Sequence, residues 1–568
     1  MKSPILVTSL GLTLLAGIHA CNTLPTTGTP SELQPALAAI TAKGLLEPIG
    51  VLSSDAFEGR GPGTAGEEKS VAYILDQFRG MGLKPGNPNG TLVQEVPLIG
   101  FLDTPTGSIA AGGQVIPLKY KNDFMANSHR YDPEVKVENS GIVFVGYGVV
   151  APEYGWDDFK GVDVRGKTIV MLVGDPPVPD PADSSRLDEK MFKGKAMTYY
   201  GRWTYKFEIA SERGAAAAIV VHETDAAGYP FNVVSGGWAQ EQFDIVRPDR
   251  NQSHVAVESW FTTDAATRVF AAAHQDFAAL KKAALRKDFR PVAIDATASF
   301  DVKHTVRQVN SRNVVARLEG SDPRLKDEYV IYSAHWDHLG KNDQTTPPAI
   351  FHGAVDNASG IAAVLETARA FTKIQPPPRR SILFLATTAE EKGLLGAKYY
   401  AENPLYPLPK TVANINYDGL NAWGEATDIV VVGLGATTLE DTLVRLAAVH
   451  RRTVRPDPQP EKGGFYRNDE FEFAKQGVPT IHASSGTDYL GRPPGWGLQK
   501  RDDFVANDYH KPTDVIKPDW NLSGAVADVR LLLELGYHVA QDPSAPQWKA
   551  GTEFKAKRDA MMRSAWGG

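Results

Sequence analysis

Histidine and acidic side chains follow an apolar segment of this chain, at the point where a strand would end. Residues 329–333 are apolar and lead into Ala334-His335-Trp336-Asp337-His338. Alternation along an extended chain points His335 and Asp337 to one side and Trp336 to the other. A histidine beside a carboxylate is typical of a metal ligand and the group that orients its ring. The segment therefore indicates metal chemistry.

Further donors of the same kind follow at wide intervals. Asp356 precedes the helix-like segment 361–371, where a lone aspartate is equally suited to capping the helix. Glu390 and Glu391 come just after an apolar segment, and two adjacent carboxylates repel each other unless a cation lies near them. The remaining candidates are Asp418, in Asn416-Tyr417-Asp418, and His510, in Tyr509-His510-Lys511-Pro512. Each has an ordinary structural explanation alone, but together they supply donors of zinc-binding type.

The segments around these residues alternate between strand-like and helix-like patterns. This alternation predicts an α/β fold with a mixed sheet and helices on both faces. Open sheets of this kind hold ligands outside the carboxyl ends of their strands, where the candidate donors lie. The predicted strands are 329–333, 381–387, 429–432 and 480–483, and the predicted helices are 361–371, 394–401 and 522–538.

The rest of the chain divides into regions of different character. Residues 31–98 have helical periodicity and contain a glycine-rich loop at 59–66, and we expect residues 31–103 to form the N-terminal part of the catalytic domain. Residues 104–300 contain short β-type segments and predict an inserted β-rich domain. The catalytic domain continues over 301–542, and the polar segment 543–568, with Pro543 and Pro546, is expected to be a peripheral tail.

The N-terminus has the pattern of an export signal. Lys2 precedes an apolar segment, 5–18, that is too short to span a membrane, and residues 1–20 are expected to be removed. Cys21, the single cysteine, ends a segment that resembles a bacterial lipoprotein signal, which predicts a lipid anchor and a periplasmic or outer-surface location. The alternative is an ordinary secreted protein that is cut after Ala20. Residues 21–30 are then a polar tether.

The charge balance excludes one class of partner. Lys and Arg total 60 against 67 Asp and Glu among 568 residues, which gives a net charge of −7. The sequence has no basic block of the kind that nucleic-acid binding needs. We therefore expect no nucleic-acid partner and no membrane contact except through a lipid on Cys21.

The candidate donors lie in motifs that resemble those of peptidase family M28, zinc aminopeptidases and carboxypeptidases with a phosphorylase/hydrolase-like α/β fold. The motifs occur in that family's order, and the resemblance covers nearly the whole mature chain. They are His335-x-Asp337, Asp356-Asn357-x-Ser359-Gly360, Glu390-Glu391-x-Gly393, Asn416-x-Asp418 and Tyr509-His510-x-Pro512-x-Asp514. Segments 143–148, 166–170 and 213–216 of the insertion resemble a protease-associated (PA) domain, which caps the active-site cleft in relatives.

The resemblance implies a role for each donor. One zinc ion is expected to bind His335 and Asp418, the other Glu391 and His510, with Asp356 bridging both. A zinc-bridging hydroxide is the expected nucleophile. The remaining implied roles are Glu390 as general base, Asp337 as hydrogen-bond partner of His335, and a cis peptide bond between Asp356 and Asn357.

Several other residues near these motifs are candidates for substrate contact or for packing. Tyr466 and Tyr509 are the two candidates for polarising a substrate carbonyl. His338 and His352 match no ligand position and are expected to have surface or packing roles. A further departure is Asn468-Asp469-Glu470, where the family often has Ser-Asp-His. Trp423 and Trp496 are equally suited to lining an apolar pocket or to core packing.

The sequence thus predicts an exported hydrolase with two zinc ions, most simply an aminopeptidase acting on short peptides. A carboxypeptidase of the same family is the first alternative, because the pocket residues that choose the peptide terminus are not identified. The others are a glutaminyl cyclase-like acyltransferase, which works with one zinc ion, and a non-catalytic receptor-like binding module. The oligomeric state stays open.

Overall fold

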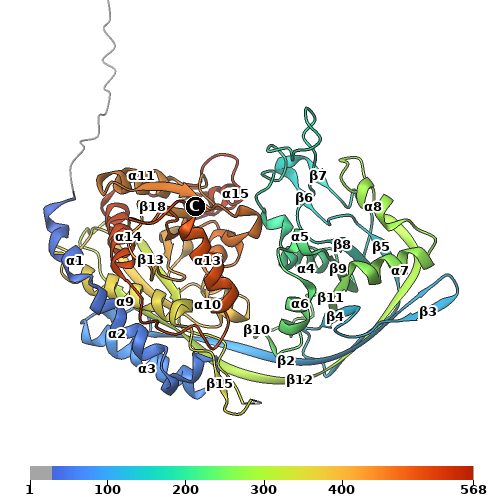
Figure 1. Ribbon diagram of the computed structural model, residues 1–568, viewed down its shortest axis with the longest axis horizontal. Helices are drawn as coiled ribbons and strands as arrows, with labels where there is room; N and C mark the ends of the chain where they lie inside the picture. Colours follow the sequence, from blue (N-terminus) through green and yellow to red (C-terminus); the bar gives the residue numbers. More distant parts are fainter. Residues whose placement is uncertain (1–28, 344, 567–568) are drawn as a thin grey trace, which may run out of the picture.

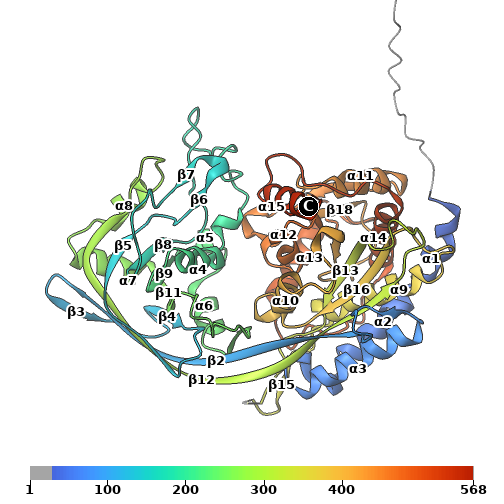
Figure 2. The same cartoon turned by 180° about the vertical axis from the view of Figure 1, so that it is seen from behind.

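Two long strands connect the two lobes of the protein (Figures 1 and 2). The computed structural model describes residues 29–343 and 345–566. Strand β2 (Val93–Ala111) pairs antiparallel with β12 (Val292–Leu318), in continuous register from Val93 opposite Val314 to Ala111 opposite Ala296. Thr104 and Phe300, the expected limits of the insertion, lie inside these strands. The chain therefore passes between the lobes without a break in strand pairing.

The predicted signal, Cys21 and residues 22–28 of the predicted tether lie outside the described residues. Within the described part of the chain, no single helix has both the length and the apolar composition to span a membrane. One pair of helical segments, Ser31–Ala39 and Ala42–Leu52, meets these criteria only jointly and is bent by 41° between its members.

The first lobe contains a mixed sheet in which the central strands run parallel. β13, β16, β17 and β20 are parallel neighbours, whereas β12 and β18 pair antiparallel with this group. Four strands that the sequence predicts are confirmed here, with only small changes at their ends. In spatial order the strands are β19 (Thr453–Pro456), β18 (Asp428–Val432), β20 (Thr480–Ser485), β17 (Thr411–Asn416), β13 (Tyr329–His335), β16 (Ser381–Thr387) and the last part of β12.

Alternating side chains of the central strands face two helical layers. On one face, Tyr332 and Phe384 belong to a core with the N-terminal helices, α9, α11 and α14. On the other face, Ile331 and Leu385 pack with α10 and α12. The predicted mixed sheet with helices on both faces is therefore observed. The helices are α1 (Gln34–Ala39), α2 (Ala42–Leu52), α3 (Ala65–Gly80), α9 (Gly360–Phe371), α10 (Leu395–Glu402), α11 (Thr438–Val449), α12 (Glu470–Lys475) and α14 (Ser523–Gln541).

The expected helical pattern of residues 31–98 ends early. Helix α3 ends at Gly80, and β2 begins at Val93. Gln94, Val96 and Leu98 are buried on one side of β2, while Glu95, between Gln94 and Val96, is exposed. This period of two is typical of a strand. The segment therefore forms a strand, although the residues before it are mainly helical.

The second lobe has its own hydrophobic core, formed by side chains between Ile109 and Val302. Parallel strands β5, β8, β9 and β11 form its centre, and β4 closes the sheet antiparallel to β11. Helices pack against this sheet (Figure 1). The elements are β4 (Phe124–Asn127), β5 (Glu134–Phe144), β8 (Thr168–Leu172), β9 (Ala217–His222), β11 (Val257–Thr262), α4 (Trp203–Glu212), α7 (Thr263–Ala272) and α8 (Phe277–Ala283).

The C-terminal segment differs from the expected peripheral tail. Trp548 and Phe554 are buried in a cluster with Phe465, and α15 (Lys555–Trp566) follows them. The Trp548 indole N–H donates a hydrogen bond of 2.9 Å to the carbonyl oxygen of Gly477. The sequence does not predict this packing, because Trp548 and Phe554 are each isolated among polar residues.

We expect Trp548→Ala to lower the free energy of unfolding by about 3–5 kcal/mol, since it deletes a buried indole and leaves a cavity. Val444, which is 48% exposed on α11, provides a control. Val444→Ala should change the stability by no more than about 0.5 kcal/mol. Urea unfolding followed by circular dichroism measures both values. Equal losses for the two variants would show that the segment adds little stability.

Candidate metal centre

Adjacent parallel strands position most of the candidate donors. His335 is the last residue of β13, Asp418 follows the end of β17, and Glu390 and Glu391 follow β16 in a short turn, η6 (Glu390–Lys392). β13 lies between β17 and β16 in the sheet. The carboxyl ends of these three strands therefore bring the four side chains to one edge.

Asp356 and His510 reach the same place from loops. Asp356 lies in the turn Ala354–Ser359, and its peptide bond to Asn357 is cis, which confirms the sequence prediction. The carboxylate of Asp514 accepts hydrogen bonds of 3.0 Å from the backbone N–H groups of Val355 and Asp356. The last aspartate of the His510 motif thus holds the Asp356 turn in place.

The two oxygens of Asp356 face two different groups of donors. Oδ1 lies 3.3 Å from Nε2 of His335, which is also 3.4 Å from Oδ1 of Asp418. Oδ2 lies 3.1 Å from Nε2 of His510, which is 3.0 Å from Oε2 of Glu391. Asp356 thus lies between two pairs, each made of one histidine and one carboxylate.

This donor set fits two divalent metal ions. Zinc–ligand bonds of about 2.0–2.2 Å place neighbouring ligands of a tetrahedral site about 3.4 Å apart. The separations around Asp356 are close to that value. The Nε2 atoms of His335 and His510 are also buried and have no hydrogen-bond partner among the described residues. Ring nitrogens without partners that face carboxylates are suited to metal coordination.

The protonation of the acidic ligands matches this arrangement. Burial raises the pKa of Glu391, but the charges of His510 and His338 outweigh it and lower the pKa to about 2. Burial acts on Asp356 in the same way, and His335 and His510 hold its pKa well below the ordinary value. Both side chains are therefore carboxylates at neutral pH, which is the form that binds metal.

Glu390 has the opposite character. Its Oε2 lies 3.8 Å from Nε2 of His335, farther than the carboxylates of Asp356 and Asp418. Burial raises the pKa of Glu390 well above its ordinary value, and the charges of Asp418 and Glu391 raise it further. A carboxyl group with a raised pKa is suited to accepting and returning a proton.

Asp337 holds the Glu390–Glu391 turn rather than the ring of His335. Its carboxylate accepts the backbone N–H of Glu390 at 3.1 Å and that of Glu391 at 3.4 Å. Nδ1 of His335 lies 3.2 Å from the backbone carbonyl of Asp337 and 3.7 Å from its carboxylate. The predicted side-chain hydrogen bond to His335 is thus replaced by a backbone contact.

His338 is part of the cluster, although the sequence predicts a packing or surface role. Its side chain is fully buried, and Nδ1 lies 2.7 Å from Oε1 of Glu391. His352, in contrast, lies toward the surface with Nε2 2.8 Å from Asp55. The spacing of His338 from His335 does not reveal the contact, because it depends on the position of the turn after β16.

Arg60 is a second residue that sequence reasoning misses. It lies in the glycine-rich loop and is fully buried, and burial lowers the pKa of its guanidinium to about 10. It donates hydrogen bonds of 2.9 Å to the carbonyl oxygens of Trp336 and Gly353. Arg60 therefore joins the loop after β13 to the turn that carries Asp356.

The position of Tyr466 excludes the expected carbonyl-polarising role. Its hydroxyl donates a hydrogen bond of 2.7 Å to Glu553, and its ring packs against Phe471 and Tyr199. Tyr466 belongs to the aromatic cluster that holds the C-terminal segment. Tyr509, the other candidate, is 42% exposed, and its ring stacks on His510 with a centroid distance of 3.8 Å.

The atypical segment Asn468-Asp469-Glu470 supports the strand ends from behind. Thr387 donates a hydrogen bond to the Asp469 carboxylate, and burial raises the pKa of Asp469 to about 7. Glu470 accepts a hydrogen bond of 2.9 Å from the side-chain amide of Asn416. These contacts tie β16 and β17 to helix α12.

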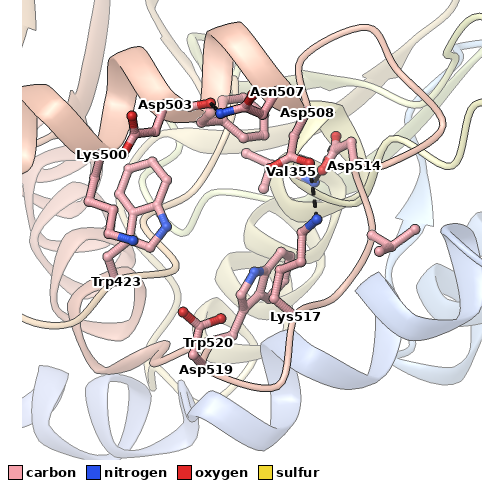
Figure 3. Close-up of a pocket in the computed structure, with 12 residues that line it drawn as sticks. Val355, Trp423, Lys500, Asp503, Asn507, Asp508, Asp514, Lys517, Asp519 and Trp520 are labelled. Atoms are coloured by element: carbon pink, nitrogen blue, oxygen red, sulfur yellow. Dashed lines mark hydrogen bonds and ion pairs between the residues drawn. The ribbon is translucent and has the colours of Figure 1, made fainter.

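A cavity of about 240 Å³ lies beside the Asp356 turn (Figure 3). Trp423 and Trp520 line it together with charged side chains, and Lys517 reaches Asp508 at 3.0 Å. Trp423 also packs against the hydrophobic core, so it does not line an apolar pocket here. Trp496 packs edge-on against Tyr489 with a centroid distance of 5.1 Å and does not line this cavity.

The comparison with family models identifies one segment. Residues 313–533 match the model of peptidase family M28. This segment contains all of the predicted ligands and both Glu390 and Asp337.

Two relatives match a shorter stretch. A "Probable zinc metalloprotease" of Pyrenophora teres f. teres is 38% identical over 122 residues, which are 21% of this chain and 24% of that protein. "Aminopeptidase NAALADL1" of Rattus norvegicus is 37% identical over 124 residues, 21% of this chain and 15% of that protein. The chain thus spans about a quarter or less of the length of these relatives.

One solved structure aligns over most of the chain. The aminopeptidase from Aneurinibacillus sp. strain AM-1 has a TM-score of 0.48 and 19% identity, and the alignment covers 90% of this chain and 97% of the other.

We expect Asp337→Asn to weaken metal binding by about 10–100-fold, because it perturbs the turn that carries Glu390 and Glu391. Asp158→Asn is the matched control. Asp158 is equally buried and accepts hydrogen bonds from Val149 N–H at 2.9 Å and from the Trp156 indole at 2.8 Å, but it lies in the second lobe. Zinc titration against a competing chelator measures both variants. Equal affinities would remove Asp337 from its positioning role.

We also expect zinc binding to release protons. Burial lowers the pKa of His510, but the charges of Glu391 and Asp356 more than offset it and raise the pKa to about 10 without metal. Since only the neutral ring binds metal, zinc affinity should rise with pH below about 10, by up to about tenfold per pH unit for each proton released.

Calorimetry at pH 7 in two buffers of different ionisation enthalpy counts the released protons. His352→Gln changes a histidine outside the cluster and should release as many protons as the unmodified protein. Heats that do not depend on the buffer would contradict the raised pKa of the histidine ligands.

Proposed function

We propose that this protein is an exopeptidase with two zinc ions that releases N-terminal residues from short peptides. The match of residues 313–533 to the model of peptidase family M28 supports this proposal. The observation that carries this proposal is the placement of Asp356. Its two oxygens face two histidine–carboxylate pairs, at 3.3 Å from His335 and 3.1 Å from His510. A single bridging carboxylate between two such pairs is suited to a dinuclear site.

The ligands divide as the sequence indicates. His335 and Asp418 would hold one ion, Glu391 and His510 the other, and Asp356 both. Bound zinc lowers the pKa of a water molecule and polarises the carbonyl of the scissile peptide bond. His338 and Asp337 keep the Glu391 carboxylate and the turn that carries it in position.

Glu390 performs the proton transfers in this proposal. Its carboxylate lies 3.8 Å from Nε2 of His335, farther than the carboxylates of Asp356 and Asp418. It takes a proton from the attacking water as the oxygen forms its bond to the carbonyl carbon. It then gives this proton to the amine nitrogen as the carbon–nitrogen bond breaks. The raised pKa of Glu390 favours uptake of the proton from water.

The remaining parts of the proposal concern the surroundings of the site. We propose that the second lobe is a PA-type domain that limits substrate size from across the cavity between the lobes. We also propose export of the protein, with a lipid on Cys21 as its anchor. The support for these two proposals is the segment resemblance in the insertion and the composition of residues 1–21.

The activity is tested with purified protein that lacks residues 1–21. Two equivalents of zinc and release of anilines from amino-acid anilides are expected, together with no release when the amino group is blocked. Release only from substrates with a free carboxylate would replace the aminopeptidase with a carboxypeptidase. A single zinc ion with cyclisation of N-terminal glutamine would favour a cyclase, and no metal and no turnover would leave a binding module.

Glu390→Gln should keep both zinc ions and lose turnover by about 10²–10⁴-fold, since it removes the proton acceptor but no ligand. Glu391→Gln, a matched change at the next residue, should instead lose zinc. Metal analysis and anilide hydrolysis on the same samples separate the two effects. Full turnover of Glu390→Gln with zinc bound would exclude Glu390 as the general base.

A further inference from the structure

A second group of histidine and acidic side chains lies in the second lobe. It consists of His129, Asp244, His254 and Glu258, which we name the interlobe cluster. We propose that the interlobe cluster binds one further divalent metal ion of zinc type. None of its residues lies in segment 313–533.

Sheet pairing brings the interlobe cluster together. His129 follows β4, and Glu258 lies in β11, which pairs with β4 so that Glu258 is opposite Asn127. His254 lies in the loop before β11. Asp244 lies in β10 (Gln242–Ile245), which pairs with β2 rather than with β11. Residues from two strands and two loops thus converge on one point.

The distances within the interlobe cluster suit a shared ion. The ligand atoms of His129, His254 and Glu258 all lie within 4.8 Å of one another. Nδ1 of His129 and Nδ1 of His254 lie 3.8 and 3.7 Å from the same atom, Oδ2 of Asp244. These separations are too long for hydrogen bonds. They are near the value of about 3.4 Å between neighbouring ligands of a tetrahedral zinc ion.

Two polar groups at this point have no hydrogen-bond partner. The Glu258 side chain belongs to a residue that is only 8% exposed, and it forms no hydrogen bond or lysine or arginine ion pair with any described residue. Oδ1 of Asn127, opposite Glu258, is buried without a hydrogen-bond partner in the described part of the chain. Both residues line one cavity, so a cation that enters it can reach the Glu258 carboxylate.

Asp244, in contrast, is held in place. Its Oδ1 accepts the backbone N–H of Ile245 at 2.7 Å, and its Oδ2 accepts the side-chain amide of Asn251 at 3.0 Å. No lysine or arginine in the described ranges forms an ion pair with it. Of the nearby basic side chains, only His129 and His254 come within 4.0 Å of its carboxylate. Asp244 is therefore a fixed acceptor that faces two imidazole rings.

The residue types of the interlobe cluster suit a divalent ion. Its two carboxylates and two imidazole rings offer four ligands, and the carboxylates balance a doubly charged ion. Imidazole with carboxylate favours zinc, copper or nickel, whereas calcium and magnesium favour oxygen ligands alone.

The interlobe cluster is open to solvent through a cavity of about 630 Å³ between the lobes. The second lobe lines this cavity with Trp203, Phe207 and Trp238. The first lobe lines it with Lys392, Gly393 and Leu395, which follow the Glu390–Glu391 turn. An ion therefore has an entry path, and the cavity wall opposite the interlobe cluster belongs to the candidate metal centre's own turn.

Anomalous diffraction at the zinc edge tests the proposal on crystals of the full chain grown with zinc. We expect a peak about 2.0–2.2 Å from the ligand atoms of His129, His254 and Glu258. Metal analysis after dialysis should then give one zinc more than in the double variant His129→Gln/His254→Gln. His274→Asn, a change at an exposed histidine of the same lobe, should keep the full zinc content.

The outcomes separate this proposal from the proposed function. Two outcomes would overturn the interlobe site alone. One is a set of peaks confined to the candidate metal centre. The other is an interlobe peak with no extra zinc after dialysis, which means binding at crystal concentration only. An interlobe peak without zinc at the candidate metal centre would overturn the dinuclear peptidase alone.

If the double variant does not fold, Glu258→Gln replaces it, because the change keeps the side-chain size. We expect Glu258→Gln to weaken zinc binding at the interlobe cluster by at least about tenfold. Unchanged affinity at this cluster would show that Glu258 is not a ligand and would overturn the site as proposed.

Discussion

Negative charge concentrated at one edge of the sheet is the constraint on which the rest of the structure depends. Burying a carboxylate is costly unless a cation or several hydrogen-bond donors compensate it. The buried cation beside the cluster, Arg60, donates to backbone carbonyls rather than to carboxylates. Its charge acts on Asp356, Asp514, Asp337 and Glu391 without a direct hydrogen bond to their carboxylates. Since one such charge does not balance all of these acids, further positive charge must come from the histidines or from bound metal. The acidic groups involved are Asp337, Asp356, Glu390, Glu391, Asp418, Asp469 and Asp514.

The acidic side chains at this edge have two different roles. Asp337 and Asp514 accept backbone N–H groups and so fix the turns that carry Glu390 and Asp356. These two acids are compensated by peptide dipoles. Asp469 accepts a hydrogen bond from Thr387. The other four carboxylates face histidine nitrogens, which leaves them available to metal. Some acidic side chains hold turns and others are free to bind metal. This division explains how so many acidic side chains can lie at one edge of the sheet.

Local patterns in the sequence predict which residues lie at the strand ends. Strand ends are visible as apolar segments, so the positions of His335 and Glu390 follow from the chain alone, and the structure places them at one edge. The contacts of Arg60 and His338 are not visible in this way. Arg60 bonds to Trp336, which is 276 residues away in the sequence. Such a contact depends on how the helices pack, and local periodicity in the sequence does not predict it.

The same limit applies to Tyr466 and to the interlobe cluster. Tyr466 lies in a loop close in sequence to the acids behind the site, yet its hydroxyl turns to Glu553, in a segment whose composition suggests a tail. The interlobe residues are spread over 130 positions of a region for which the sequence predicts only short strands. Their convergence follows from the pairing of β4 with β11 and of β10 with β2, and register of this kind is set by the whole sheet.

Strand β10 shows how the two lobes act on one turn. Phe243 and Ile245 pack in a small core with Ala389, the residue before Glu390, and with Leu395. Asp244 between them faces His129 and His254 instead, as alternation along a strand requires. Lys392, at the end of the turn, lies 5.8 Å above the ring of Phe243. Because β10 pairs with β2, which runs unbroken into the first lobe, the position of Glu390 is fixed by the second lobe as well as by its own strand.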